Sequence, residues 1–389
     1  DRAHVVLLIR AALATALLGL AVSCPAAAQE AKHHPVNLTF LYPIGTNQDP
    51  NVSTTFQLSV LHGRVGSLRG LGINGLVSMV ERDMRGIQLT GAYSQVGGDS
   101  RGLRVTGVAN HTKGDASGIH VAGIANVNRG TVGGLELGGL MNLVGGNLRG
   151  IQMTALANVV DQGAKGFQIS GFANAVGGPV DGWQLASGFN YAAGGLVGLQ
   201  LGGANVAPRM EGTQIGIANF AARSTGLQVG MFNRAEQQEG IPFGMVNLAR
   251  NGDADWVNYA SNVSGFNTGV RTSIRRFYSM LTAGLPDLKG DVRQTLVLTW
   301  NYGYAIPAGE RTSIGIDLGF AHYIPEKVDD PDENDRLHYA LQARALAERT
   351  LSQKMKGFVG AGVARISDDY RLDAPFTTEP LFFGGVALY

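Results

Sequence analysis

The chain has 389 residues, and its 31 Lys and Arg residues nearly balance its 30 Asp and Glu residues, which leaves a formal net charge of +1 at pH 7. This balance excludes the strongly basic surface that is typical of nucleic-acid binding. A single cysteine, Cys24, excludes a disulfide framework. Glycine is common, with 56 residues, and its concentration between residues 70 and 252 marks that stretch as a separate region.

The N-terminus is typical of an export signal. Basic residues precede an apolar run at residues 11–22, and the alanines at residues 26–28 offer a small-residue cleavage site. We therefore predict a signal peptide over residues 1–28. The surroundings of Cys24 also have a faint lipoprotein character, so lipidation of Cys24 is an alternative.

Two short alternations of apolar and polar residues, at residues 36–44 and 54–62, precede the glycine-rich region and predict β-strands. We assign residues 29–69, which contain them, to the barrel that the end of the chain predicts. This assignment inserts the glycine-rich region between early and late strands of one barrel.

The dominant feature of the middle of the chain is a glycine that returns every sixteen residues. It runs from Gly70 to Gly198 and then returns after fourteen residues at Gly212, Gly226 and Gly240. These marker glycines open twelve copies of one unit, read as Gly-apolar-Gln-apolar-x-Gly-apolar-x-Asn. A short fixed period means that each unit builds its core by stacking on its neighbours. We assign residues 70–252 to these repeats.

Two folds fit this unit: a β-solenoid, in which each unit is one coil, and a membrane barrel, in which each unit is one strand. Barrel strands run up and down, so their turns alternate between short and long and the natural period is two units. The turns here look alike, as at residues 96–98, 144–146 and 176–178, which favours the solenoid. An outer-membrane pore or transport protein with the repeats as extra barrel strands is the alternative.

Within each unit, apolar residues alternate with a polar residue, which is usually Gln. Period two is a strand signal, and we interpret it as apolar residues in the core and polar residues on the surface. The polar column would then be a possible interaction face. Its members are Arg104, His120, Glu136, Gln152, Gln168, Gln184 and Gln200.

An asparagine closes most units, from Asn110 to Asn247. An Asn repeated at one corner can hydrogen-bond to the Asn above and below it, as in the amide ladders of cross-β assemblies. We therefore interpret the Asn column as structural and not as a binding site.

The last third of the chain is rich in aromatic residues and predicts an antiparallel barrel. Residues 292–305, 312–320 and 337–344 alternate between apolar and polar side chains. Each run is about as long as the nine to eleven residues that a tilted transmembrane strand needs. A soluble antiparallel sheet alternates in the same way, but the export signal and the aromatic residues favour the barrel. We predict seven strands after Asn262 and assign residues 253–389 to them.

The final residues, 381–389, resemble the last strand of bacterial outer-membrane barrels, which ends in an aromatic residue that the assembly machinery reads. The repeats, such as residues 198–205 and 226–233, resemble those of a bacterial surface-repeat outer-membrane protein family. The first resemblance implies contact with outer-membrane lipid and with the outer-membrane assembly machinery. The second implies a place at the surface of a Gram-negative bacterium and carries no activity with it.

The sequence contains few candidate catalytic or metal-binding residues. Arg104, His120 and Glu136 occupy the same slot in consecutive units and would be neighbours in a stack, which we interpret as a solvated, ion-paired face. A secreted carbohydrate-active β-helix enzyme that uses this patch is the second alternative. The acidic run at residues 329–335 offers oxygen ligands for Ca²⁺ but lacks EF-hand spacing, and the histidines show no metal-ligand spacing. We predict no catalytic residue, cofactor or metal.

Together these patterns predict an all-β protein, with a β-solenoid of about twelve coils of 14–16 residues and a small antiparallel transmembrane β-barrel. The predicted function is non-enzymatic: a structural, adhesive or scaffold role in the outer membrane. No motif names the surface partner.

Overall fold

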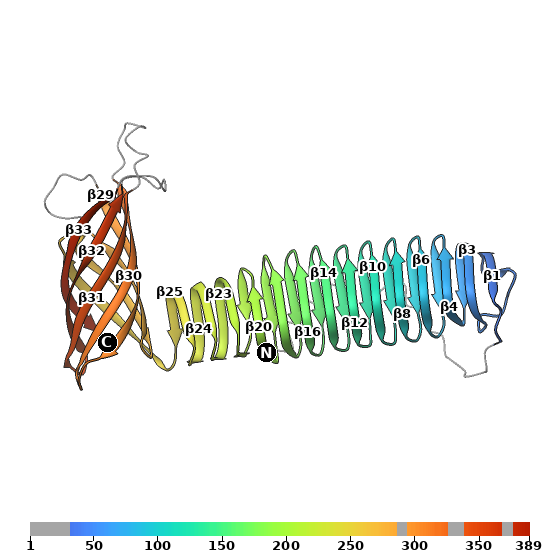
Figure 1. The fold of residues 1–389 in the computed structure, drawn as a ribbon, viewed down its shortest axis with the longest axis horizontal. Coiled ribbons are helices and arrows are strands. Elements are labelled where there is room, and N and C mark those ends of the chain that lie inside the picture. The colour runs from blue at the N-terminus through green and yellow to red at the C-terminus, as the bar shows by residue number, and fades with distance from the viewer. Residues whose placement is uncertain (1–31, 286–293, 326–337, 368–375) are drawn as a thin grey trace, which may run out of the picture. The chain divides into compact units, whose positions relative to one another are not determined.

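The computed structural model describes residues 32–285, 294–325, 338–367 and 376–389, and every regular element in these ranges is a β-strand. The strands form a parallel β-solenoid and a closed antiparallel barrel of eight strands (Figure 1), which confirms the predicted fold class. The chain divides into two compact units, Asp1–Ile215 and Gly216–Tyr389. The second unit contains the last coils of the solenoid as well as the barrel strands.

Most coils contribute one longer strand and one short strand, and strands of each kind stack in parallel on their equivalents in the neighbouring coils. The longer strands form what we call the long-strand sheet: β4 (Ser67–Asn74), β6 (Met84–Thr90), β8 (Ser100–Thr106), β10 (Ala116–Ala122), β12 (Val132–Gly138), β14 (Leu148–Thr154), β16 (Ala164–Ser170), β18 (Pro179–Ala186) and β20 (Gly195–Leu201). The others form the short-strand sheet: β5 (Val77–Val80), β7 (Tyr93–Val96), β9 (Ala109–Thr112), β11 (Ala125–Asn128), β13 (Met141–Val144), β15 (Ala157–Val160), β17 (Ala173–Val176), β19 (Phe189–Ala192) and β21 (Ala204–Val206). The remaining solenoid strands are β1 (Val36–Leu41), β2 (Ile44–Gly45), β3 (Ser53–Val65), β22 (Arg209–Met210), β23 (Thr213–Ser224), β24 (Leu227–Gln238) and β25 (Ile241–Ala249).

The strands before the repeats belong to the solenoid. β3 pairs in parallel with β4 and β5, and β1 pairs in parallel with β3. The prediction that residues 29–69 contribute barrel strands is therefore wrong, and Figure 1 shows β1 and β3 stacked on the coil of β4. The physical reason is that period-two alternation is the same in both settings, so only the partner strand decides between them.

The nine marker glycines of the sixteen-residue units are required by backbone geometry. The glycines from Gly70 to Gly198 in this column have φ between 110° and 150°, a conformation that residues with a side chain rarely adopt. They also lie against one another in register, as Gly102 and Gly118 do. A Cβ on Gly118 would lie 2.2 Å from the carbonyl oxygen of Gly102, so the stack has no room for a side chain.

The barrel strands follow one another in chain order, and each pairs with the next. They are β26 (Gly252–Ser261), β27 (Gly265–Ile274), β28 (Phe277–Gly284), β29 (Gln294–Pro307), β30 (Thr312–Pro325), β31 (His338–Ser352), β32 (Met355–Ser367) and β33 (Phe376–Leu388). β26 closes the barrel by pairing with β33, with Trp256 opposite Leu388. The prediction of seven strands missed β26, because both of its faces carry polar residues: Asp255 is buried and Asn258 lies on the opposite face.

Candidate functional site: a polar interior and an apolar exterior

The polar column of the repeats lies inside the solenoid. All seven predicted interaction residues are buried, with exposed fractions between 0% and 2%: Arg104, His120, Glu136, Gln152, Gln168, Gln184 and Gln200. The prediction that they form an outward interaction face is therefore wrong. The apolar residues beside the column point outward instead, and Ile87 and Leu89 are 43% and 38% exposed. The polar residues face inward and the apolar residues outward, the opposite of the prediction, because stacked amides can form their hydrogen bonds with one another inside the fold.

The buried glutamines form a hydrogen-bonded ladder along the solenoid axis. Gln200 Nε2 donates to Gln184 Oε1 at 2.8 Å, and Gln184 Nε2 donates to Gln168 Oε1 at 2.9 Å. Gln168 Nε2 donates to Gln152 Oε1 at 3.0 Å, and Gln152 Nε2 donates to Glu136 Oε2 at 2.8 Å. Because coils stack at about the 4.8 Å spacing of paired strands, each amide reaches the next one.

The asparagines form a second ladder, which confirms their structural interpretation. Asn110 Nδ2 donates to Asn126 Oδ1 at 2.9 Å, and Asn126 Nδ2 donates to Asn142 Oδ1 at 2.9 Å. The same amide of Asn110 also donates to the carbonyl oxygen of Val121 at 2.9 Å. Here each amide donates toward the C-terminal coil, whereas each Gln donates toward the N-terminal coil.

A charged segment interrupts the Gln ladder. The guanidinium of Arg104 donates to Thr112 Oγ1 at 2.7 Å and to the carbonyl oxygen of Ser94 at 3.0 Å. Glu136 accepts hydrogen bonds from Gln152 and from Asn128. Burial lowers the pKa of Arg104 to about 9, and burial raises the pKa of Glu136 to about 7. The two opposite charges are separated by one coil, which His120 occupies.

His120 is held neutral in this interior. Its Nε2 lies 3.4 Å from Ser100 Oγ. Burial, followed by the positive charge of Arg104, lowers the pKa of His120 to about 3. Unfolded His120 takes up a proton below its ordinary pKa of 6.5, while folded His120 does not. Its contribution to stability is therefore complete above pH 6.5 and is lost as the pH falls toward 3.

We expect His120→Gln to remove this acid sensitivity. At pH 8 the free energies of unfolding of the two proteins should be similar, because Gln continues the ladder. At pH 5 the variant should be the more stable by roughly 2 kcal/mol, from about 1.4 kcal/mol per pH unit. Chemical denaturation at both pH values measures the difference in free energy of unfolding between the two proteins. The contributions of other titrating groups, such as His111 and Glu136, are nearly the same in both proteins and therefore largely cancel. Parallel pH profiles of the two proteins would contradict the expectation.

The charged segment is not accessible to a substrate in solution. It consists of Arg104, His120 and Glu136. All three side chains are at most 2% exposed, so a polysaccharide cannot reach them. The interpretation of this segment as a solvated, ion-paired face is wrong for the same reason.

The exterior of the long-strand sheet is apolar. Two columns of exposed apolar residues run along it, and a third follows the adjacent corner. Their exposed members, which we call the apolar face, are 36% to 53% exposed: Ile73, Leu76, Ile87, Leu89, Val105, Val108, Ile119, Ile124, Leu140, Ile151, Met153, Leu156, Phe167, Ile169, Phe172, Trp183 and Leu201. Contiguous exposed apolar surface of this kind marks an interaction site in a soluble or membrane-associated protein.

A row of cations borders the apolar face. Of the residues that precede the marker glycines, five are basic and exposed, and we call them the cation row: Arg69, Arg85, Arg101, Arg149 and Lys165. The same position is acidic and exposed in three later coils, at Asp181, Glu211 and Glu239. Strand pairing aligns Arg69 with Arg85, and Arg85 with Arg101. Arg101 contacts Asp99 at 3.0 Å, and Lys165 contacts Asp181 at 3.2 Å.

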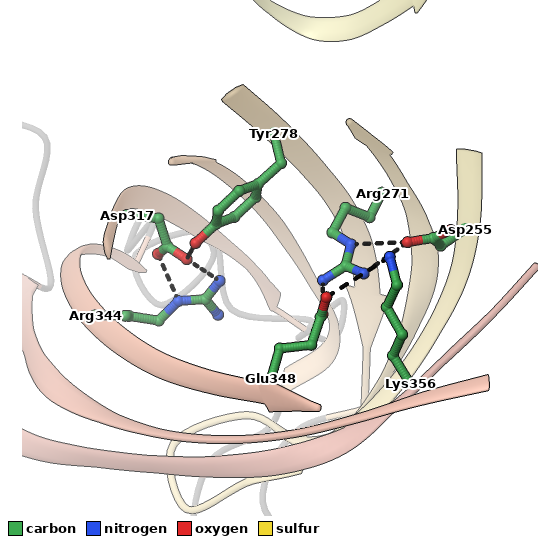
Figure 2. Close-up of polar contacts among 7 residues, drawn as sticks. All are labelled: Asp255, Arg271, Tyr278, Asp317, Arg344, Glu348 and Lys356. Atoms are coloured by element: carbon green, nitrogen blue, oxygen red, sulfur yellow. Dashed lines mark hydrogen bonds and ion pairs between the residues drawn. The ribbon is translucent and has the colours of Figure 1, made fainter. Parts of the chain in front are cut away.

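The interior of the barrel contains buried ion pairs beside a cluster of buried aromatic and aliphatic side chains that includes Tyr259 and Phe383. Figure 2 shows Asp317 between Arg344 and Tyr278: Arg344 Nε lies 2.7 Å from Asp317 Oδ1, and the Tyr278 hydroxyl donates to Asp317 Oδ2 at 2.7 Å. A second group joins Arg271 to two carboxylates. Arg271 Nη2 lies 2.6 Å from Asp255 Oδ2, and its Nη1 pairs with Glu348. No sequence pattern identified these pairs, because alternation does not show which side chains meet across neighbouring strands, and Glu348 lies 77 residues from Arg271.

The outside of the barrel is apolar. Exposed fractions reach 70% at Leu318, 66% at Val359 and 59% at Phe382. Asp317, next to Leu318 in β30, is 2% exposed. The outside of the barrel is therefore apolar, where the outside of a soluble barrel is polar, and the interior holds both ion pairs and apolar side chains.

No family model, curated protein or solved structure matches this chain. Among the described residues, no helix is long and apolar enough to cross a membrane. In the same ranges, His, Cys, Asp and Glu residues nowhere gather in a group that would hold a metal ion. The predicted signal peptide, Cys24 and the acidic run at residues 329–335 lie outside the described residues.

Proposed function

We propose that this chain is a non-enzymatic outer-membrane protein of a Gram-negative bacterium, in which the barrel is the anchor and the solenoid is a rigid scaffold that presents a repeated surface. The apolar exterior of the barrel carries the proposal. Leu318 and Val359 face outward, while the ion pair of Asp317 and Arg344 lies in the interior. Charged groups inside and apolar groups outside fit a surrounding of lipid hydrocarbon.

Strand length supports the same reading. β29 to β33 have between 13 and 15 residues each, more than the roughly nine to eleven that a tilted strand needs to cross a bilayer. The last strand, β33, ends next to Tyr389, which is 50% exposed. We propose that this aromatic end is what the outer-membrane assembly machinery recognises, in line with the resemblance of residues 381–389.

The solenoid supports a scaffold role and not catalysis. Its carboxylate and basic groups in the ladder column are enclosed, and the two amide ladders share the interior with buried apolar side chains such as Leu68 and Met84. The pore alternative, with repeats as extra barrel strands, is contradicted because the repeats pair in parallel with one another and the barrel closes with eight strands. Side chains fill the interior of a barrel of this size.

The anchoring proposal is tested by fractionation and gel migration. We expect the protein in the outer-membrane fraction, and a band that migrates differently before and after boiling, because a folded barrel resists detergent. Planar bilayers containing the purified protein should show no ion conductance. Recovery in the soluble periplasm, or steady conductance, would contradict the proposal.

A further inference from the structure

The extent of the apolar face indicates that another surface binds to it. It extends over consecutive coils of the long-strand sheet, and its two columns on that sheet are two positions apart in the chain, as Ile87 and Leu89 are. Phe167 and Trp183 lie in register on it with their rings 5.2 Å apart, edge to face. A flat apolar surface of this extent is costly to leave in water.

The cation row indicates the charge of the surface that binds to the apolar face. Arg69 and Arg85 are exposed and opposite each other in neighbouring strands. Like charges aligned in this way destabilise a sheet. Among the described residues, no carboxylate forms an ion pair with Arg69, Arg85 or Arg149. A surface with many anionic groups beside an apolar layer would neutralise the row and cover the columns together.

We propose that the apolar face docks on the surface of an anionic phospholipid leaflet, with the aliphatic columns among the upper acyl chains and the cation row at the phosphates. This inference rests on the proposed membrane anchoring, which keeps the solenoid near a lipid surface. Interfacial binding of this kind combines buried apolar area with attraction to anionic lipid. A second copy of the chain is the other occupant that the charges allow, because Asp181 and Glu211 continue the same row in the later coils, and the test below distinguishes it from lipid.

The test uses the full chain, in a Cys24→Ser background, reconstituted in vesicles of phosphatidylethanolamine and phosphatidylglycerol. One variant carries Leu89→Cys on the apolar face. Its matched control carries Gln95→Cys, on the short-strand sheet of the same coil. Both are labelled with an environment-sensitive fluorophore. A nitroxide attached to the lipid and a water-soluble quencher then report which medium surrounds each label.

We expect the lipid nitroxide to quench the label at position 89 and the aqueous quencher to reach the label at position 95. Arg69→Gln with Arg85→Gln should reduce the lipid quenching at position 89 by about half, and high salt should act in the same direction. Lys113→Gln with Arg129→Gln removes two turn cations and should change it little. Vesicles of phosphatidylcholine alone should give weaker lipid quenching.

Equal access of the aqueous quencher to positions 89 and 95 would overturn the inference. So would a label at position 89 that is shielded from both quenchers and forms a disulfide between two chains when unlabelled, since that outcome identifies a second copy as the occupant. In each case a heat-modifiable band from the same vesicles leaves the anchoring proposal standing. If the chain fails to enter the vesicles in folded form, the proposed function fails, and this inference fails with it.

Discussion

Gly134→Ala is expected to destabilise the solenoid by roughly 3 kcal/mol or more, while Gly133→Ala should change its stability by no more than about 1 kcal/mol. Gly134 has φ of 126°, and a Cβ there would lie 2.1 Å from the carbonyl oxygen of Gly118. A Cβ on Gly133 would have no neighbouring atom within 4 Å. Its neighbours in register, Ser117 and Arg149, already carry side chains.

The two substitutions add the same methyl group to adjacent residues, so each is the control for the other. Circular dichroism during denaturation measures the loss of stability, and limited proteolysis should locate new cuts near the altered coil, because coils depend on their nearest neighbours. The barrel should keep its heat-modifiable migration in both variants. Equal stability of the two variants would show that the glycine stack is not the constraint described here.

Asp317→Ala is expected to destabilise the barrel by about 3–5 kcal/mol, because it leaves the guanidinium of Arg344 without its carboxylate. The side chains of Asp317 and Arg344 are 0% and 1% exposed, and the substitution also removes the acceptor of the Tyr278 hydroxyl. The denaturant concentration at which the heat-modifiable band disappears measures the effect.

The double variant Asp317→Leu with Arg344→Met is the control. Replacing both members of a buried ion pair by apolar residues is often nearly neutral, so the double variant should recover most of the stability that the single variant loses. By contrast, Asp181→Ala removes an exposed ion pair with Lys165, whose side chain is 75% exposed, and should cost less than about 1 kcal/mol. A double variant no more stable than the single one would contradict the account.

Much of the fold was predictable from local spacing. A glycine at every sixteenth residue requires one backbone geometry per coil, and the structure places Gly102 and Gly118 opposite each other as a parallel stack demands. The identical step of the asparagines likewise predicted the ladder between Asn110 and Asn126. Both inferences depend only on the repeat length and on what one residue type does when it is stacked on itself.

The candidate site was not predictable in the same way. Alternation between Gln88 and Leu89 establishes that they face opposite sides of a strand, but either one is compatible with the interior. The usual preference for apolar cores predicted that the Gln column faces solvent. That prediction is wrong because Gln amides in register hydrogen-bond to one another along the solenoid axis when they are buried. The resulting exterior, with Leu89 exposed, is the surface from which the lipid-docking inference arises.

The sequence by itself therefore determined the repeat unit, the solenoid and the presence of an antiparallel barrel, since each follows from periodicity along the chain. Only the tertiary structure decided that the Gln column lies inside the solenoid, that β1 and β3 join the solenoid, and that β26 closes the barrel against β33. It also paired Arg271 with Glu348, which lie 77 residues apart. These outcomes depend on which strands meet across the fold, and local periodicity is the same whichever partner a strand finds.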